Sequence, residues 1–418
     1  MRIPDRRRAV LAPLAAALLA ALLLSGCGVA GLAAHPPRPA SVDPALAQAA
    51  DRFGVSLLQA VAAARPGENL FLSPLSAQVI LGLTANGARG ATQAEMLEAL
   101  GYGGMDLAAV NAANQDLRGL LADPDPRVAI STANAIWYQS GFAVEPSFRR
   151  VAEGEYGAEV QATRFGTPEA AAAINRWVSR RTRGRIAQLV QETHADLRMV
   201  LVNALYFKGE WEKQFNPGRT EPRPFHRLDG TEAEVPFMHQ TETFGYLAEE
   251  GLVGVRLPYG GGDLALYVFM PDEWEGFVEG LTPERYQGWV AAMAEERVRL
   301  AFPKVRLTDR HQLNDALMAL GMERAFDPQR ADFSGLFEAS EPLYIDWVIQ
   351  NTFLEINEEG TEAAAATAVS TRSGSAPPRA LPEVVLDRPF LLAIRDDRTG
   401  VTLFLGAIVD PAGAERRG

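Results

Sequence analysis

Residues 357–379 read NEEGTEAAAATAVSTRSGSAPPR, and this stretch lies between two segments that look like β-strands. It contains a run of alanines and then Ser, Thr, Gly, Pro and Arg, with no side chain that builds a core. No proline interrupts the first half, so every backbone N–H there can join a β-ladder. In an extended conformation one face carries only small or β-branched side chains, which fit a buried, pleated surface. These are Thr361, Ala363, Ala365, Thr367 and Val369.

The composition of this stretch allows two interpretations. It indicates a long exposed loop whose first half can become a strand inside a packed sheet, where a bulky or charged inward side chain would block entry. It fits equally well an alanine-rich linker, helical or disordered, because alanine is the best helix former. Motifs elsewhere in the chain are needed to choose between them.

The N-terminus has the pattern of an export signal. Four arginines within Met1–Arg8 precede the apolar run Ala9–Leu24, and Ser25-Gly26-Cys27 follows. This order is typical of a secretory signal peptide. The string LLLSGC resembles the bacterial lipobox, whose cysteine becomes the lipidated first residue, although an ordinary signal peptide with an incidental cysteine has the same outline. We expect a lipoprotein signal at 1–26, a lipidated tether at 27–43 anchored to a membrane through Cys27, and one folded domain at 44–418. The expected location is the extracytoplasmic face of the bacterial cell envelope, with release to the extracellular space left open.

Composition excludes several classes of function. The 418 residues are 47% hydrophobic and carry 40 basic and 52 acidic side chains, a net charge of -12, which disfavours nucleic acid as a partner. Cys27 is the single cysteine, so no intramolecular disulfide is possible. The five histidines show no metal-binding spacing and no G-x-S-x-G occurs. We therefore expect neither an enzyme nor a metal or other cofactor.

Helical and strand-like patterns are segregated in runs, which favours an α+β fold with large, mainly antiparallel sheets. Helices are expected at 44–64 with Asp43 as cap, at 76–84, at 92–100 with a Thr92/Glu95 capping box, and at 170–190. The last of these carries five arginines, for which a solvated face is the preferred interpretation. The main strands are expected at 129–138, 199–209, 252–258, 264–270, 298–304, 343–359, 383–387, 390–395 and 402–409.

Several long motifs resemble those of one family, in the same order along the chain. GTEAAAATAV after NEE resembles the hinge of inhibitory serpins. Similar matches are ENLFLSPLSA at 68–77, INRWVSRRTRGRI at 174–186, VNALYFKGEWEKQF at 202–215 and DRPFLLAIRDDRTGVTLFLGAIVDP at 387–411. The resemblance implies a serpin fold of three β-sheets and eight or nine helices, with an exposed reactive-centre loop at about 360–380.

The resemblance also implies a function. Such a protein is a suicide inhibitor of serine-type endopeptidases: the protease attacks the loop, and the cut loop inserts into the main sheet before the acyl-enzyme is hydrolysed. The expected partner is the target protease in a covalent complex with a monomeric inhibitor. The alternative is a non-inhibitory serpin-fold envelope lipoprotein that binds or carries a ligand. A heparin-like polyanion is not expected, because Arg118 is the only basic residue of 107–121.

Individual residues take roles from this resemblance. The hinge comprises Glu358, Gly360, Thr361 and the alanines Ala363, Ala364, Ala365 and Ala366. Lys304 matches the lysine that pairs with the hinge glutamate, and Trp211 matches the tryptophan of the same region, called the breach. Ser73, Ser76 and Asn203 match the polar cluster under the sheet, called the shutter, where the family usually has a histidine and this chain has Gln350.

The reactive bond follows from spacing. Counting about sixteen residues from Glu358 places it between Gly374 and Ser375, which suggests a protease with a preference for small residues. Arg372-Ser373 is the rival bond and suggests a trypsin-like target. Neither the target protease nor its origin, nor the membrane that would carry the anchor, follows from the sequence. The effect of Gln350 on the opening of the sheet is left open as well.

Overall fold

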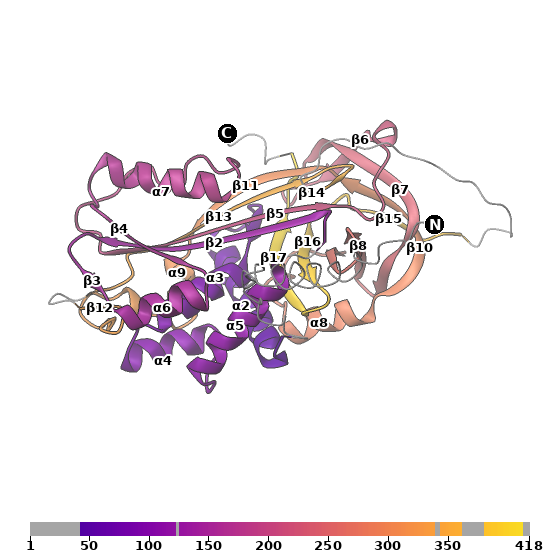
Figure 1. The fold of residues 1–418 in the computed structure, drawn as a ribbon. Helices are drawn as coiled ribbons and strands as arrows, with labels where there is room; N and C mark the ends of the chain where they lie inside the picture. The colour runs from indigo at the N-terminus through magenta and orange to yellow at the C-terminus, as the bar shows by residue number, and fades with distance from the viewer. Residues whose placement is uncertain (1–41, 123–124, 339–342, 362–379, 413–418) are drawn as a thin grey trace, which may run out of the picture. The chain divides into compact units, whose positions relative to one another are not determined.

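The computed structural model describes residues 42–122, 125–338, 343–361 and 380–412. Within these ranges it has eight α-helices and three sheets (Figure 1). The helices are α2 (Pro44–Ala64), α3 (Pro74–Ala85), α4 (Gly90–Ala99), α5 (Leu107–Leu121), α6 (Pro146–Gly154), α7 (Pro168–Arg181), α8 (Pro283–Ala292) and α9 (Asn314–Ala319), with 3₁₀ turns η1 (Pro217–Arg219) and η2 (Arg324–Phe326). No helix of the described residues is both long enough and apolar enough to cross a bilayer.

The six-stranded sheet, here called the main sheet, contains Gly360 and Thr361, near the start of the stretch 357–379. Its order is β11 (Val305–Gln312), β13 (Trp347–Ile356), β14 (Gly360–Thr361), β5 (Met199–Glu210), β2 (Val128–Gln139) and β4 (Glu159–Thr163). β13 and β5 also pair directly and in parallel, from Trp347 opposite Val200 to Thr352 opposite Leu205. The two-residue strand β14 therefore lies between two strands that are neighbours along most of their length.

The nine-stranded sheet supports the main sheet from the other side of the core. Its order is β1 (Leu70–Leu72), β17 (Val401–Ile408), β16 (Phe390–Asp396), β9 (Leu264–Pro271), β8 (Leu252–Tyr259), β7 (Glu232–Glu249), β10 (Ala294–Pro303) and β15 (Glu383–Val385), with β6 (Glu221–His226) on β7. β3 (Ala143–Val144) and β12 (Phe337–Glu338) form a small third sheet. The predicted α+β class, the three sheets and the helix number are confirmed.

Buried apolar side chains form two separate clusters, one on each face of the main sheet. The larger cluster lies among α2, α3, the nine-stranded sheet and the inner face of the main sheet. The smaller one lies under α7, where Trp177, Ile186 and Val190 pack against Val202 of β5 and Ile349 of β13. Figure 1 shows α7 on one side of the main sheet and α2, α3 and α5 on the other. The junction between β5 and β13 is thus covered on both faces.

Two helix boundaries differ from the sequence prediction. The helix predicted at 92–100 begins at Gly90 with no side-chain cap, and Thr92 instead accepts a hydrogen bond from the Asp332 N–H. Glu95 binds Arg324, so the predicted capping box was wrong because tertiary partners take both side chains. The helix predicted at 170–190 ends at Arg181. In contrast, α2 has the predicted bounds, and Asp43 Oδ1 accepts from the Ala45 N–H.

Candidate functional site

The start of the loop already lies inside the main sheet. Gly360 is opposite Glu210 of β5, and Thr361 is opposite both Gly209 of β5 and Ile356 of β13. Both hinge residues are buried. The chain therefore enters the sheet as an antiparallel strand at the end of the β5–β13 pairing, and we call the point where β5 and β13 stop pairing the fork.

Gly360 fits this position because its backbone approaches β5 very closely. A Cβ on Gly360 would lie 2.1 Å from the Gly209 carbonyl oxygen and 2.7 Å from Glu210 Cα. Real Cβ atoms do not approach backbone atoms this closely, so any other residue would push the hinge out of the sheet. The glycine is required here by the space between the strands.

Thr361 is held by an aromatic pocket below the hinge. Its hydroxyl lies 2.6 Å from the Tyr259 hydroxyl, and Tyr259 is fully buried. The Tyr259 ring stacks on Trp211 at 4.5 Å between centroids and meets Phe207 edge-on at 5.1 Å. Burial raises the pKa of Tyr259, which keeps the phenol neutral and able to share a hydrogen bond with Thr361.

The turn before the hinge is fixed by charge and by backbone hydrogen bonds. Lys304 Nζ lies 2.9 Å from Glu358 Oε2, and the Thr220 hydroxyl donates to Glu358 Oε1 at 2.7 Å. Burial alone would raise the pKa of Glu358, but these two hydrogen bonds lower it below its usual value, so the carboxylate stays charged. Trp211 Nε1 donates to the Asn357 carbonyl at 2.9 Å. The structure thus brings Glu358, Lys304 and Trp211 together around the hinge.

A second polar group lies deeper under the β5–β13 junction. The side-chain oxygen Oε1 of Gln350 accepts from the Ser73 N–H at 2.9 Å, and its Nε2 donates to the Ser73 carbonyl at 2.8 Å and to Asn203 Oδ1 at 2.9 Å. Asn203 Nδ2 donates to Asn134 Oδ1 of β2 at 2.6 Å and to Ser76. We call these five residues the shutter network. Gln350 ties β13 to Asn203 of β5, and Asn203 extends the network to β2.

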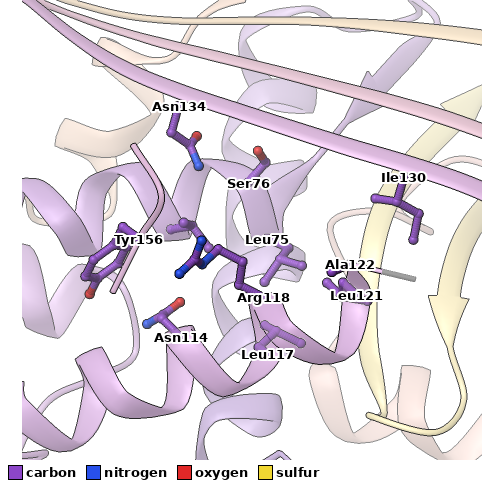
Figure 2. Close-up of a pocket in the computed structure, with 11 residues that line it drawn as sticks. Leu75, Ser76, Asn114, Leu117, Arg118, Leu121, Ala122, Ile130, Asn134 and Tyr156 are labelled. Carbon is purple, nitrogen blue, oxygen red and sulfur yellow. The ribbon is translucent and has the colours of Figure 1, made fainter. Parts of the chain in front are cut away.

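A cavity of about 240 Å³ adjoins the shutter network on its β2 side (Figure 2). Ser76 and Asn134 reach its wall, while Leu75 and Leu117 form part of its apolar lining. Figure 2 shows Arg118 of α5 among these side chains, and its guanidinium donates to the Gly154 carbonyl at 2.7 Å. The shutter network is therefore closely packed on its β13 side and borders the cavity on the side of α5.

The other predicted residues lie outside the described part of the chain. These are Cys27, Ala363, Ala364, Ala365, Ala366, Arg372, Ser373, Gly374 and Ser375. Within the described part no cluster of His, Cys, Asp or Glu is arranged to hold a metal ion.

Sequence analysis missed three contributors to the site. Tyr259, Thr220 and Asn134 contact the hinge or the shutter network but belong to no motif. Tyr259 directly precedes Gly260, which indicates only a turn. Their roles arise from contacts with residues distant in sequence, so no local signal could have identified them.

Comparison with known proteins agrees with this geometry. The family model "Serpin (serine protease inhibitor)" matches residues 48–411. Serpin-Z7 of Hordeum vulgare is 34% identical over 382 residues, covering 86% of this chain and 95% of that protein. An uncharacterized serpin-like protein of Thermococcus kodakarensis is 35% identical over 348 residues, covering 82% and 81%.

Solved structures give the same result. The native state of Tengpin, a thermophilic serpin, matches with a TM-score of 0.82 and 28% identity over 88% of this chain and 95% of that one. A thyroxine-binding globulin complex with thyroxine matches with a TM-score of 0.80 and 27% identity over 88% and 99%. With the family model covering most of the sequence, the chain belongs to the serpin family.

Proposed function

We propose that this chain is an irreversible inhibitor of serine-type endopeptidases that traps the acyl-enzyme by inserting its cleaved loop into the main sheet. Most members of its family inhibit serine proteases. The observation that carries the proposal is the position of Gly360 and Thr361, which already form the first two residues of an additional strand between β5 and β13. The loop therefore needs to lengthen an existing strand and does not need to start a new one.

The register of β14 predicts where each further residue would lie. Each step along the loop moves one step back along both β5 and β13, because β14 is antiparallel to both. Three steps after Thr361, Ala364 comes opposite Tyr206 and Phe353. Six steps after Thr361, Thr367 comes opposite Asn203 and Gln350. The inserting strand would thus pass the fork and then the shutter network.

The alternation of side chains suits this path. Thr361 points toward the inner core, where its hydroxyl meets Tyr259. In the inserted strand every second residue after it would point the same way. All of these are small or β-branched, as the packed space between the sheets requires. The outward positions, from Ala364 to Ala368, would pass beneath α7 with methyl groups only.

The length of the strand explains how a bound protease would be displaced. Ten residues after Thr361 carry the strand to the far end of β5 at Met199, a distance of about 33 Å at about 3.3 Å per residue. A serine protease cleaving after Gly374 would form an ester with that residue's carbonyl and release the new amino terminus at Ser375. The ester lies three residues beyond Thr371, so full insertion would carry the enzyme across the length of the sheet. Distortion of its active site there would prevent water from hydrolysing the ester.

The test is the formation of a covalent complex. The mature protein is incubated with trypsin, elastase and subtilisin, and the products are separated under denaturing conditions and weighed by mass spectrometry. An inhibitor gives a complex of inhibitor and enzyme joined by an ester, with a peptide starting at Ser375 released. The rival bond gives a peptide starting at Ser373 and a complex with trypsin alone. Cut loop without any complex, and an unfolding temperature unchanged by cleavage, would contradict the proposal.

That negative outcome would favour the second candidate, a carrier protein. The fold match to a thyroxine-binding globulin complex with thyroxine is the observation behind it. A carrier would be cleaved in the loop without trapping the enzyme, so the same experiment separates the two functions.

We further propose that the protein acts outside the cytoplasm, as a monomer anchored to the cell envelope by lipid on Cys27. The support is the signal-like segment that precedes this cysteine. Cys27→Ser should move the protein from the membrane fraction to the soluble extracytoplasmic fraction, since acyl chains supply the anchoring. An unchanged distribution would contradict the anchor.

A further inference from the structure

Two arginines lie across the fork on the outer face of the main sheet. They belong to the crossing segment, residues 182–190, which follows α7. Arg183 lies over the Tyr206 ring at 5.2 Å from the centroid, and Arg185 lies over the Phe353 ring at 5.9 Å. Tyr206 is in β5 and Phe353 is in β13, so the two contacts are on opposite sides of the path that an inserting loop would take.

The Tyr206 and Phe353 rings lie at the end of the direct pairing between β5 and β13. Direct pairing of β5 with β13 ends at Leu205 opposite Thr352. Tyr206 and Phe353 are the next residues of the two strands, and they are therefore the first to separate when the sheet opens from the hinge. The crossing segment contacts both strands at the point where opening would begin.

Hydrogen bonds fix the crossing segment to α7 and to the edge strand β11. The Thr182 hydroxyl donates to the Val178 carbonyl at 2.9 Å and accepts from the Ile186 N–H at 3.2 Å. Arg310 of β11 donates to the Leu189 carbonyl at 2.9 Å. Among the described residues, Arg183 is the one non-glycine residue with a positive φ, 52°. Holding an arginine in this left-handed conformation costs energy, which the contact with Tyr206 helps to offset.

Opening of the sheet must disturb these contacts. Neighbouring strands are about 4.8 Å apart, so a strand added between β5 and β13 moves them apart by about that distance. Cation–π attraction fades beyond about 6 Å from the ring centroid. Since one contact is at 5.2 Å and the other at 5.9 Å, both cannot survive the widening unless the crossing segment itself moves.

We propose that Arg183 and Arg185 form a latch that holds the main sheet closed at the fork and limits the rate of loop insertion. The latch regulates the proposed inhibitory mechanism, and its part in inhibition rests on that proposal. The register places Ala364 opposite both Tyr206 and Phe353, so the latch would be reached three residues after the part of the loop already inserted. It holds the sheet closed before cleavage, and it must open for the cleaved loop to insert.

The solvated arginines expected here are present, since Arg176, Arg180, Arg183 and Arg185 are all exposed. Only Arg176 and Arg180 lie on α7. Arg183 and Arg185 lie beyond the helix end, and their guanidinium groups are directed onto aromatic rings. The four arginines therefore provide two latch residues and two matched controls on the same segment of chain.

The experiment measures how fast the sheet accepts a strand. A synthetic peptide TEAAAATAVSTRSG, the sequence of residues 361–374, is mixed with uncleaved protein, and its incorporation is followed by native gel and mass spectrometry. Arg185→Ala and Arg183→Asn are the test variants, because asparagine tolerates positive φ but lacks the guanidinium. Each should accept the peptide about twofold to fivefold faster than the wild type, as expected for a cation–π contact of an exposed arginine. Arg176→Ala and Arg180→Ala should accept it at the wild-type rate.

A double-mutant cycle identifies the aromatic partner. In a Phe353→Leu background the Arg185→Ala substitution should have no further effect on the rate, and Arg185→Lys should keep part of the wild-type behaviour. An equal acceleration by Arg185→Ala with and without Phe353 would overturn the latch, since the arginine would then act elsewhere.

Hydrogen exchange tests the latch without relying on insertion. The backbone amides of 206–208 and 353–355 should exchange faster in Arg185→Ala and Arg183→Asn than in the wild type and the controls. Unchanged exchange in both test variants overturns the latch, whatever the peptide does. If exchange rises as expected but no peptide enters any variant, the latch stands and the proposed insertion mechanism fails.

Discussion

Thr367 offers a sharp test of loop insertion, because its predicted place in the sheet is known and its substitution is remote from the reactive bond. The β14 register brings Thr367 opposite Asn203 and Gln350, which are at most 1% exposed. The amide groups of both residues already have hydrogen-bond partners in the shutter network. Thr367→Arg would place a guanidinium among these amides, and the buried Asp309 carboxylate on the neighbouring strand β11 is already paired with Arg65 and His311.

The outcome depends on whether the loop inserts before the acyl-enzyme is hydrolysed, and burying the new charge should slow insertion strongly. An unpaired buried charge costs about 3–5 kcal/mol even after the protein relaxes. At about 1.4 kcal/mol per factor of ten, insertion would slow by more than about 100-fold. Hydrolysis of the acyl-enzyme does not involve Thr367 and would proceed as before. The variant should therefore be cleaved as a substrate and release active protease.

The assay is the partition between complex and cleaved protein at several ratios of protein to protease. Wild type should give mainly covalent complex, and Thr367→Arg should give almost only cleaved chain. Thr367→Ser is the matched control and should behave like the wild type, because it keeps a small polar side chain. Initial cleavage rates should agree among the three proteins, since Thr367 is seven residues from Gly374. Undiminished complex formation by Thr367→Arg would refute the proposed register and the insertion with it.

Three further predictions concern the hinge. Gly360→Ala should expel the hinge from the sheet, because its Cβ would lie 2.1 Å from a backbone oxygen; limited proteolysis should then cut near this residue before it cuts the wild type. Tyr259→Phe should lower the free energy of unfolding by about 1 kcal/mol in chemical denaturation, since it removes the hydrogen bond to Thr361 and keeps the ring packing. The lowered pKa of Glu358 means that its pair with Lys304 stabilises the hinge above about pH 4.5, and that this contribution is lost as the pH falls through the lowered pKa. In the wild type, loss of this pair on acidification should change the fluorescence of Trp211, which contacts the same turn. This part of the change should be absent in Lys304→Met.

Local patterns predicted the elements that depend on local interactions. Helix α2 has the predicted bounds because its apolar spacing, the Asp43 cap and Pro44 at the first turn all act within one segment. The strands predicted at 252–258 and 264–270 are present as β8 and β9, which pair with each other. Motif resemblance extended this to Glu358, Lys304 and Trp211, which the structure brings into one cluster.

The crossing segment shows where local reasoning fails. Ile186, Leu189 and Val190 continue the apolar spacing of α7, so the sequence predicts one long helix. The same three residues are buried on the main sheet, but through a chain that leaves the helix after Arg181. Gly184, with φ 81°, is the local signal that was overlooked, because a glycine with positive φ commonly ends a helix. The contacts of Arg183 and Arg185 depend on strands far away in sequence and have no such signal.

The inserting loop would meet three sets of contacts at intervals of three residues: the aromatic pocket at Thr361, the latch at position 364 and the shutter network at position 367. The first is already made in the uncleaved protein. Changes there, such as Tyr259→Phe, should alter the stability of the starting state. The other two lie ahead of the loop and form the barrier. Arg185→Ala should therefore speed insertion while lowering the free energy of unfolding by no more than about 1 kcal/mol, whereas Tyr259→Phe should lower it by a similar amount and leave the barrier in place.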